Sequence, residues 1–322
     1  MSDEQKMLAE MADKLFAELG VSGDEGGWDQ IEEVGLGDLL VAEDAGGFGG
    51  SWDDARVVFR LAGYHGLAQP LVEAALARYV GSRAGYEGAG ALAGSAEGTF
   101  AQGRFTGQLA SIAGPHGASY LVAPYEGASL IIDLAGVQMG EGAAISGGPR
   151  LCAQVEGAPA LKVDDDVLAL AAFARAAQIA GALDAALGRS VEYVNERQQF
   201  GRPLAKFQAV QQNLATFACE AAAANCAAIG AAQALDRGEA SFEIAAAKLR
   251  ANMAAGTGAS IAHQVHGAIG FTEEYPLHHL TRRLWTWRSE MGGDAYWAKL
   301  LGESVLARGA DQFWPDMTAL TD

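Results

Sequence analysis

Residues 195–211 read NERQQFGRPLAKFQAVQ and connect two long apolar stretches, 167–197 and 207–236, neither of which contains proline. The pattern of Ala, Leu and Ile in these stretches is typical of helices with a wide buried face. Two further helices are predicted over 241–266 and 294–307. Long Ala-rich helices with short connections predict a four-helix bundle, because small side chains allow close packing.

The chain before this bundle changes character twice. Residues 1–97 show apolar residues at helical spacing, with Ser51 as a candidate N-cap for a helix over 53–65. Residues 98–163 contain short apolar runs bounded by Gly and Pro, which is typical of a small sheet. We therefore predict a mainly α fold with a small β domain: an N-terminal helical lobe (1–97), a small antiparallel sheet or barrel (98–163) and a C-terminal four-helix bundle (164–322).

The composition argues against several classes of partner. Forty acidic residues outnumber 22 basic ones and give a net charge of −18. A nucleic-acid-binding surface needs a concentrated basic face, so no nucleic acid is expected. No uninterrupted apolar run reaches the roughly 18 residues that would cross a bilayer, and the acidic start lacks the features of a signal peptide. We therefore expect a cytoplasmic protein without a membrane span.

The three cysteines point to the same compartment. Cys152, Cys219 and Cys226 are odd in number and form no CxxC pair. We expect three reduced thiols that pack as small hydrophobic side chains, with neither a disulfide framework nor a zinc site.

The connection between the two long helices carries polar groups that need an explanation. We expect its arginines and glutamines to be buried, and such groups are costly to desolvate without a partner such as an anion. Arg197 offers a planar fork for a phosphate or pyrophosphate, and Phe200 could form the wall of an aromatic ring site. Gly201 permits a tight turn. The alternative, from these residues alone, is an ordinary helix–helix loop with surface arginines.

A second stretch, residues 263–276, reads HQVHGAIGFTEEYP. Its glycines would let a ligand approach the backbone closely. His263 and His266 lie three apart on a predicted helix, but no third ligand follows at a suitable spacing. The histidine pair is therefore interpreted as structural, and no metal is expected.

Together the two stretches resemble the FAD-dependent acyl-CoA dehydrogenase family. The resemblance rests on two motifs: Arg-x-Gln-Phe-Gly-x-x-Leu-x-x-Phe-Gln-x-x-Gln at 197–211 and Gln-x-x-Gly-x-x-Gly-Phe-x-x-Glu-Tyr-Pro at 264–276. The stretch 35–50, GLGDLLVAEDAGGFGG, is similar to the family's Gly-Leu…Pro-Glu-x-x-Gly-Gly pattern. The resemblance covers most of the chain and is strong after about residue 165. It implies α,β-dehydrogenation of an acyl-CoA thioester with FAD, and an electron-transfer flavoprotein-type acceptor.

The catalytic base of the family has no clear counterpart. Counting without gaps from the Tyr-Pro turn, the family's glutamate falls on Met291, and Glu290 lies one residue earlier. A one-residue offset on a helix re-aims a side chain by about 100°, so Glu290 is a candidate base that requires a shifted loop. The other family position falls near Ala171, without a carboxylate nearby in the sequence. The alternative for Glu290 is a structural carboxylate paired with Arg282, Arg283 or Arg288.

The resemblance also implies a division of the flavin contacts. In the family, the two motifs of one subunit reach the pyrophosphate and adenosine of FAD seated in its neighbour, and these motifs are retained. The contacts within a subunit look lost, since residues 98–163 contain no tryptophan. The implied cofactor-binding residues are Arg197, Gln199, Phe200, Phe207, Gln264, Gly267 and Ala268.

A hetero-oligomer accounts for this division. The chain would lend its motifs to FAD in a larger acyl-CoA dehydrogenase subunit that supplies the base. In this it resembles the short subunits of heterotetrameric acyl-CoA dehydrogenases of bacterial steroid and bile-acid side-chain degradation. Two alternatives stay open: a homo-oligomeric enzyme that uses Glu290 as base, and a non-catalytic scaffold or binding subunit.

Overall fold

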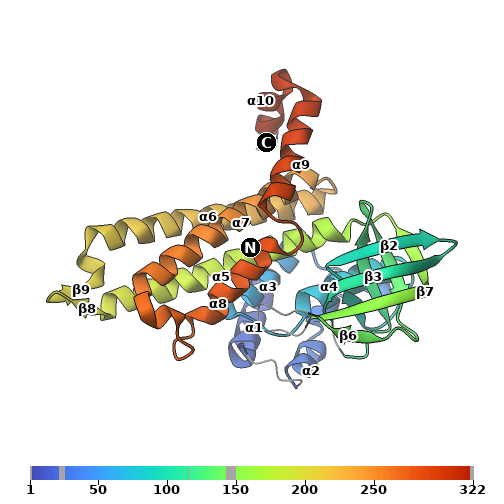
Figure 1. The fold of residues 1–322 in the computed structure, drawn as a ribbon, viewed down its shortest axis with the longest axis horizontal. Helices are drawn as coiled ribbons and strands as arrows, with labels where there is room; N and C mark the ends of the chain where they lie inside the picture. The colour runs from blue at the N-terminus through green and yellow to red at the C-terminus, as the bar shows by residue number, and fades with distance from the viewer. Residues whose placement is uncertain (1, 22–25, 115, 143–149, 320–322) are drawn as a thin grey trace.

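The computed structural model describes residues 2–21, 26–114, 116–142 and 150–319. Figure 1 shows a helical lobe and a sheet domain packed at one end of a long helical bundle. The lobe comprises α1 (Asp3–Leu19), α2 (Gly26–Glu33), α3 (Trp52–His65) and α4 (Leu71–Arg83), with the 3-10 turns η1 (Leu36–Asp38) and η2 (Glu43–Ala45).

The helical lobe is fixed to the bundle through α3. Ser51 caps this helix as expected: its hydroxyl accepts from the backbone N–H of Asp54 at 3.1 Å, and its own N–H donates to the Asp54 carboxylate at 3.0 Å. Gly181 of the first bundle helix lies so close to α3 that a Cβ there would collide with the backbone oxygen of Arg60. The lobe and the bundle therefore share one core.

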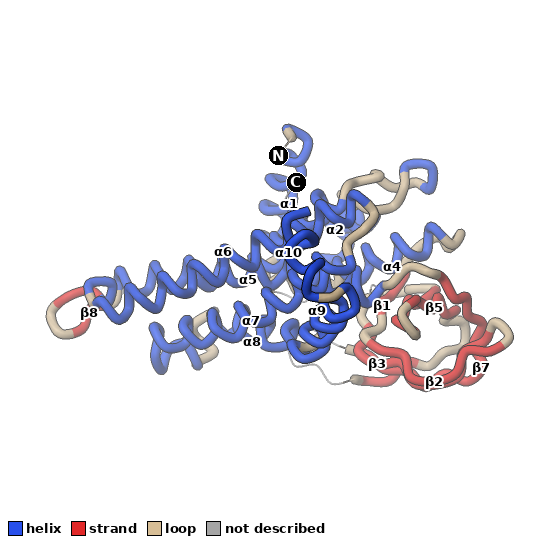
Figure 2. Tube along the Cα trace, turned by 90° about the horizontal axis from the view of Figure 1, so that it is seen from above, coloured by secondary structure: helices blue, strands red, loops and turns tan. Residues whose placement is uncertain are grey.

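The β domain is a curled sheet at one end of the molecule, next to α4 (Figure 2). Its strand order is β1-β4-β5-β7-β3-β2, with β6 paired to β7. The sheet is mixed and not wholly antiparallel as predicted, because β1 pairs with β4 in parallel. The strands are β1 (Gly90–Leu92), β2 (Ser95–Ala101), β3 (Arg104–Ile112), β4 (Tyr120–Tyr125), β5 (Ala128–Asp133), β6 (Met139–Glu141) and β7 (Leu151–Val163).

The bundle consists of α5, α6, α7 and α8. The helix predicted over 294–307 exists as α9, but α9 projects away from the bundle (Figure 1). The fourth bundle helix is α8, which buries Leu277, Leu280 and Leu284. The helices are α5 (Val167–Glu196), α6 (Gln208–Arg237), α7 (Ser241–His266), α8 (Leu277–Ser289), α9 (Asp294–Arg308) and α10 (Ala310–Ala319).

Helices α5 and α6 are more apolar on average than the search for uninterrupted apolar runs indicated. Both α5 and α6 are long and apolar enough to cross a membrane, by length and mean composition alone. Of the most apolar window of α5, 83% is buried inside the fold, as in a core helix, whereas only 28% of that of α6 is buried. Cys219 and Cys226 lie on α6 and are exposed, so the prediction that they pack as small core side chains is wrong for this chain by itself.

Candidate cofactor-contact hairpin and buried carboxylates

The connection between α5 and α6 is a preformed hairpin. Strand β8 (Gln198–Gln199) pairs antiparallel with β9 (Arg202–Pro203), and η3 (Leu204–Lys206) leads into α6. The two residues of the turn, Phe200 and Gly201, both have positive φ, of 52° and 79°. Two consecutive positive φ values characterise the turn that joins two-residue hairpins most tightly. The hairpin lies at the end of the bundle farthest from the β domain (Figure 1).

Phe200 occupies an unusual position at the tip of this hairpin. A bulky residue in the left-handed region is strained, and 89% of Phe200 is exposed. Its ring meets the half-buried ring of Phe207 at 6.2 Å, and the guanidinium of Arg202 lies 4.2 Å from the Phe207 ring centroid. Strain and exposure together favour a contact beyond this chain, because neither stabilises the chain itself.

The arginines and glutamines of the hairpin are exposed, so the expectation that they are buried is wrong. Arg197 ends α5, and its backbone N–H donates to Tyr193 O at 2.9 Å. Neither Arg197 nor Gln199 has a side-chain partner among the described residues, and both are exposed. An exposed guanidinium with no partner remains available to an anion.

The fold brings the second predicted stretch to the same end of the bundle. The ring of Tyr193 stacks on that of His266 at 4.5 Å, and its hydroxyl donates to His266 O at 3.3 Å. Gly267 follows directly with φ 65° and no neighbouring atom within 4 Å of a Cβ position. Gln264 and Ala268 are exposed beside it. The two stretches, about 70 residues apart in sequence, thus form one surface through Tyr193 and His266.

The candidate base Glu290 lies elsewhere, in a buried ion-pair network. Arg175 of α5 donates from Nε to Glu290 Oε2 at 2.9 Å, and Arg150 donates from Nη2 to Glu290 Oε1 at 3.3 Å. The same two arginines bind Glu73 of α4, at 2.5 Å from Arg175 and 3.0 Å from Arg150. Glu290 is therefore held between two cations and is not free to face a substrate.

The alternative that made Glu290 structural named different arginines. Arg288 pairs with Asp294 at 2.5 Å, and Arg283 donates to the backbone oxygen of His279. The partners of Glu290 come instead from α5 and from the start of β7. Arg175 carries the one charge in the apolar run 167–183, and a lone charge in a buried helix needs a counter-charge. That signal could have pointed to the network.

The position where the family's glutamate is counted holds no proton acceptor in its side chain. Met291 is buried with φ 53°, and its backbone oxygen accepts from Trp297 Nε1 at 3.0 Å. The turn is fixed further by Lys248, which is fully buried and donates to Trp287 O at 2.9 Å and Gly292 O at 3.2 Å. A shifted loop that would re-aim Glu290 must break these contacts.

Glu73 is the other carboxylate of the network, and sequence reasoning missed it. The fold brings it to Arg175, one helical turn along α5 from Ala171. Burial alone would raise the pKa of Glu73, but the charges of Arg175 and Arg150 and the hydrogen bond from Arg175 lower it to about 2. A general base works best with a pKa near the working pH, so Glu73 is poorly suited to that role.

Comparison with known proteins agrees with this architecture. Residues 161–306 match the family described as Acyl-CoA dehydrogenase, C-terminal domain. Acyl-CoA dehydrogenase IpdE2 of Mycobacterium tuberculosis is 31% identical over 256 residues, 77% of this chain and 76% of that protein. Acryloyl-CoA reductase (NADH) of Anaerotignum propionicum is 38% identical over 107 residues, which span 33% of this chain but only 27% of that relative.

Solved structures share the fold over nearly the whole chain. A variant of the Tcur3481-Tcur3483 steroid ACAD superposes with a TM-score of 0.86 at 23% identity, covering 96% of this chain and 99% of that chain. The ChsE4-ChsE5 complex from Mycobacterium tuberculosis gives 0.81 at 20% identity, covering 96% and 98%. A helical lobe, a curled sheet and a four-helix bundle define an acyl-CoA-oxidoreductase class of fold. The extent of the match to IpdE2 goes further: this chain belongs to the acyl-CoA dehydrogenase family.

Proposed function

We propose that this chain is one subunit of a hetero-oligomeric acyl-CoA dehydrogenase and contributes contacts to FAD that is bound in the neighbouring subunit. This contribution is called its lending role below. The chain would offer Arg197, Gln199, Phe200 and Gln264 to FAD seated in a larger subunit, and that subunit would supply the catalytic base. The observation that carries the proposal is a contrast. The hairpin arginines and glutamines are exposed and the Arg197 side chain has no partner in the part of the chain that the structure describes, whereas Glu290 is engaged by two arginines.

The hairpin end of the bundle fits the pyrophosphate side of a flavin. Arg197 would hold phosphate oxygens through its fork, and the open backbone at Gly201 and Gly267 leaves room for close approach. Phe200 and the half-buried Phe207 would pack against the adenosine or its surroundings. In the family, the chemistry that bound FAD supplies is the acceptance of a hydride from the acyl-CoA thioester.

The flavin contacts and the catalytic base that the family provides within a subunit have no matching residues in this chain. The β domain contains no tryptophan. Met291 stands at the position that ungapped counting assigns to the family's catalytic glutamate. Glu290 and Glu73 each form ion pairs with both Arg175 and Arg150. No residue of this chain is therefore assigned to proton removal. These features weigh against the homo-oligomeric enzyme with Glu290 as its base.

The surface of α6 supports association with another chain. Residues 208–233 contain a single charged residue, Glu220, which is engaged by Arg250. The helix nevertheless exposes Cys219, Cys226 and Ile229. An uncharged apolar face that runs toward the hairpin is typical of an interface. A partner covering it would bring its own site next to Arg197.

Two of the similar solved structures support a mixed assembly and a bulky substrate. Each of them, Tcur3481-Tcur3483 and ChsE4-ChsE5, is named for two proteins, and the first is a steroid ACAD. By this likeness we propose a larger acyl-CoA dehydrogenase as partner, a steroid-like acyl-CoA as substrate, and an electron-transfer flavoprotein-type acceptor. We also propose a cytoplasmic location.

The proposal is tested by co-expression with the larger acyl-CoA dehydrogenase subunit that it requires, sought among neighbouring genes. The lending role predicts that Arg197→Ala lowers the FAD retained by the purified complex, while Arg104→Ala, at an exposed arginine of the β domain, does not. Unchanged flavin content in Arg197→Ala would favour the non-catalytic scaffold instead. Assembly of each variant is checked by size-exclusion chromatography.

A further inference from the structure

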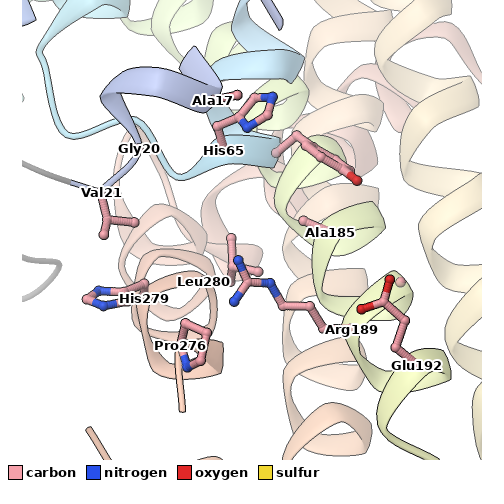
Figure 3. Close-up of a pocket in the computed structure, with 12 residues that line it drawn as sticks. Ala17, Gly20, Val21, His65, Ala185, Arg189, Glu192, Pro276, His279 and Leu280 are labelled. Carbon is pink, nitrogen blue, oxygen red and sulfur yellow. The ribbon is translucent and has the colours of Figure 1, made fainter. Parts of the chain in front are cut away.

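A cavity of about 390 Å³ lies where the helical lobe meets the bundle, and no residue of the hairpin or of the ion-pair network lines it. Figure 3 shows its walls. Its volume lies in the range of small-molecule sites. Residues that line it include Ala17 of α1, His65 of α3, Ala185 and Arg189 of α5, and His279 and Leu280 of α8.

Arg189 gives this cavity its chemical character. Its guanidinium lies beside Leu280 in the middle of the cavity (Figure 3) and is half-buried. It has no carboxylate or carbonyl partner among the described residues. Of the other polar wall groups, His65 Nε2 is engaged by Asp13 Oδ1 at 2.8 Å. Glu192 brings a negative charge to the exposed edge of the cavity but forms no ion pair with Arg189 among the described residues. A partly desolvated guanidinium without a counter-charge is costly, and an oxyanion would remove that cost.

A second arginine behind the wall adds positive charge. Arg283 is buried, with 6% of it exposed. Within the described residues its guanidinium donates to the backbone oxygen of His279 at 3.1 Å. Its Nη1 lies 3.5 Å from a Cβ position at Gly66, next to the wall residues Val21 and Leu280. Arg283 has no carboxylate partner in the part of the chain that the structure describes.

Burial first, and then neighbouring cations, lower the pKa values of two groups at this cavity. Burial, and then the charge of Arg282, lower the pKa of Arg283 to about 10. Burial, followed by the charges of His278, Arg283 and Arg189, lowers the pKa of His279. In a chain with a net charge of −18, this is a local concentration of positive charge. Such focusing in a cavity attracts anions.

We propose that this cavity binds a small molecule through one carboxylate or phosphate group held by Arg189. Arg283 would add to the attraction from behind the wall. The small apolar side chains of Ala17, Ala185 and Leu280 would accommodate a short uncharged remainder. The site shares no residue with the flavin hairpin, so it stands or falls independently of the proposed function.

The test is calorimetric titration of the full chain with inorganic phosphate and, separately, with butyrate, at constant ionic strength set by chloride. We expect saturable binding of at least one probe, and the tighter one identifies the anionic group. Arg189→Gln should weaken that binding about tenfold or more. The matched control is Arg237→Gln, which removes the same charge from an exposed side chain at the far end of α6 and should leave binding unchanged.

Two results would overturn the proposal: no saturable heat from either probe, or the same loss of affinity in Arg189→Gln and Arg237→Gln. Circular dichroism checks that each variant folds. If Arg189→Gln does not, Arg189→Lys replaces it, because lysine keeps the charge but loses the fork. Weaker binding by this variant than by Arg237→Gln supports the site, and equal binding contradicts it.

Discussion

Arg175 donates from Nε to the carboxylate of Glu290 at 2.9 Å and thereby joins the first bundle helix to the turn that follows α8. Only 3% of the Arg175 side chain and 17% of the Glu290 side chain are exposed. A pair this well buried costs a great deal to separate, because either partner would remain as an uncompensated charge. In typical family members the turn after α8 carries the catalytic base. In this chain the Arg175–Glu290 ion pair fixes the position of that turn.

Glu290→Gln should reduce stability without removing catalysis from the assembled complex. Loss of one charge from the network is expected to lower the unfolding free energy by about 3 kcal/mol. The matched control is Glu73→Gln, in the other carboxylate of the same network. Denaturant unfolding and turnover of the complex are measured for both variants.

The two carboxylates should behave alike in that comparison. If Glu290 were the base, its variant alone would lose roughly a hundredfold or more in turnover. A selective loss in Glu290→Gln, with folding and assembly intact, would contradict the structural role assigned to Glu290.

Glu73 should make stability depend on acid pH. Its folded pKa of about 2 lies below the ordinary value of 4.5. A lowered carboxyl pKa stabilises the fold above pH 4.5, and this contribution is lost as pH falls toward 2. The difference in unfolding free energy between wild type and Glu73→Gln should narrow by roughly 2 kcal/mol between about pH 6 and about pH 3. A constant difference would show that Glu73 is not held ionised by its arginines.

Lys248 should make the stability of the fold depend on pH in the neutral to alkaline range. Burial, and then the charge of Arg175, lower its pKa from 10.5 to about 7. The unfolded chain therefore binds a proton that the folded chain lacks between these values, and stability rises with pH across that window. Relative to Lys248→Met, wild type should gain on the order of 1 kcal/mol per pH unit there. Parallel unfolding curves of wild type and variant from pH 7 upward would rule this out.

Phe200→Gly should separate the hairpin's flavin role from its structural role. Glycine relieves the strain of φ 52° but loses more backbone entropy on folding, so stability should stay within about 1 kcal/mol of wild type. FAD retained by the complex should fall, because an exposed aromatic contact is gone. Thermal unfolding of the chain and flavin content of the complex are the two measurements. Full flavin retention would show that the ring does not contact the cofactor.

Cys226→Glu tests the exposed face of α6. A charge on this face should prevent co-purification with the larger subunit, while the exposed position leaves unfolding of the isolated chain unchanged. The control is Ala101→Glu at an exposed position of β2. A complex that forms equally well with both variants would place the interface elsewhere.

Much of this fold could be predicted from local patterns. The periodic apolar stretches became α5, α6 and α7 within a residue or two, and Ser51 caps α3 as expected, because these features depend on neighbouring residues. The fourth bundle helix was misassigned, since α8 is rich in arginine and histidine and its apolar face is narrow. The motifs near Arg197 and Gly267 could be recognised because they are continuous in sequence.

The ion-pair network could not be predicted in the same way. Arg175, Arg150, Glu73 and Glu290 come from four separate elements, and only tertiary packing brings them together. The burial of α6 was overestimated for a related reason. Hydrophobicity indicates that a face is to be covered, but it does not say whether the same chain or another one covers it.

The most direct test of the lending role compares the flavin content of this chain purified alone with that of the chain co-purified with its larger subunit, by visible absorbance. We predict a colourless chain alone, without turnover, and a yellow complex with about one FAD per pair of unlike subunits, as expected for a site shared across an interface. A yellow, active preparation of this chain alone would contradict the account.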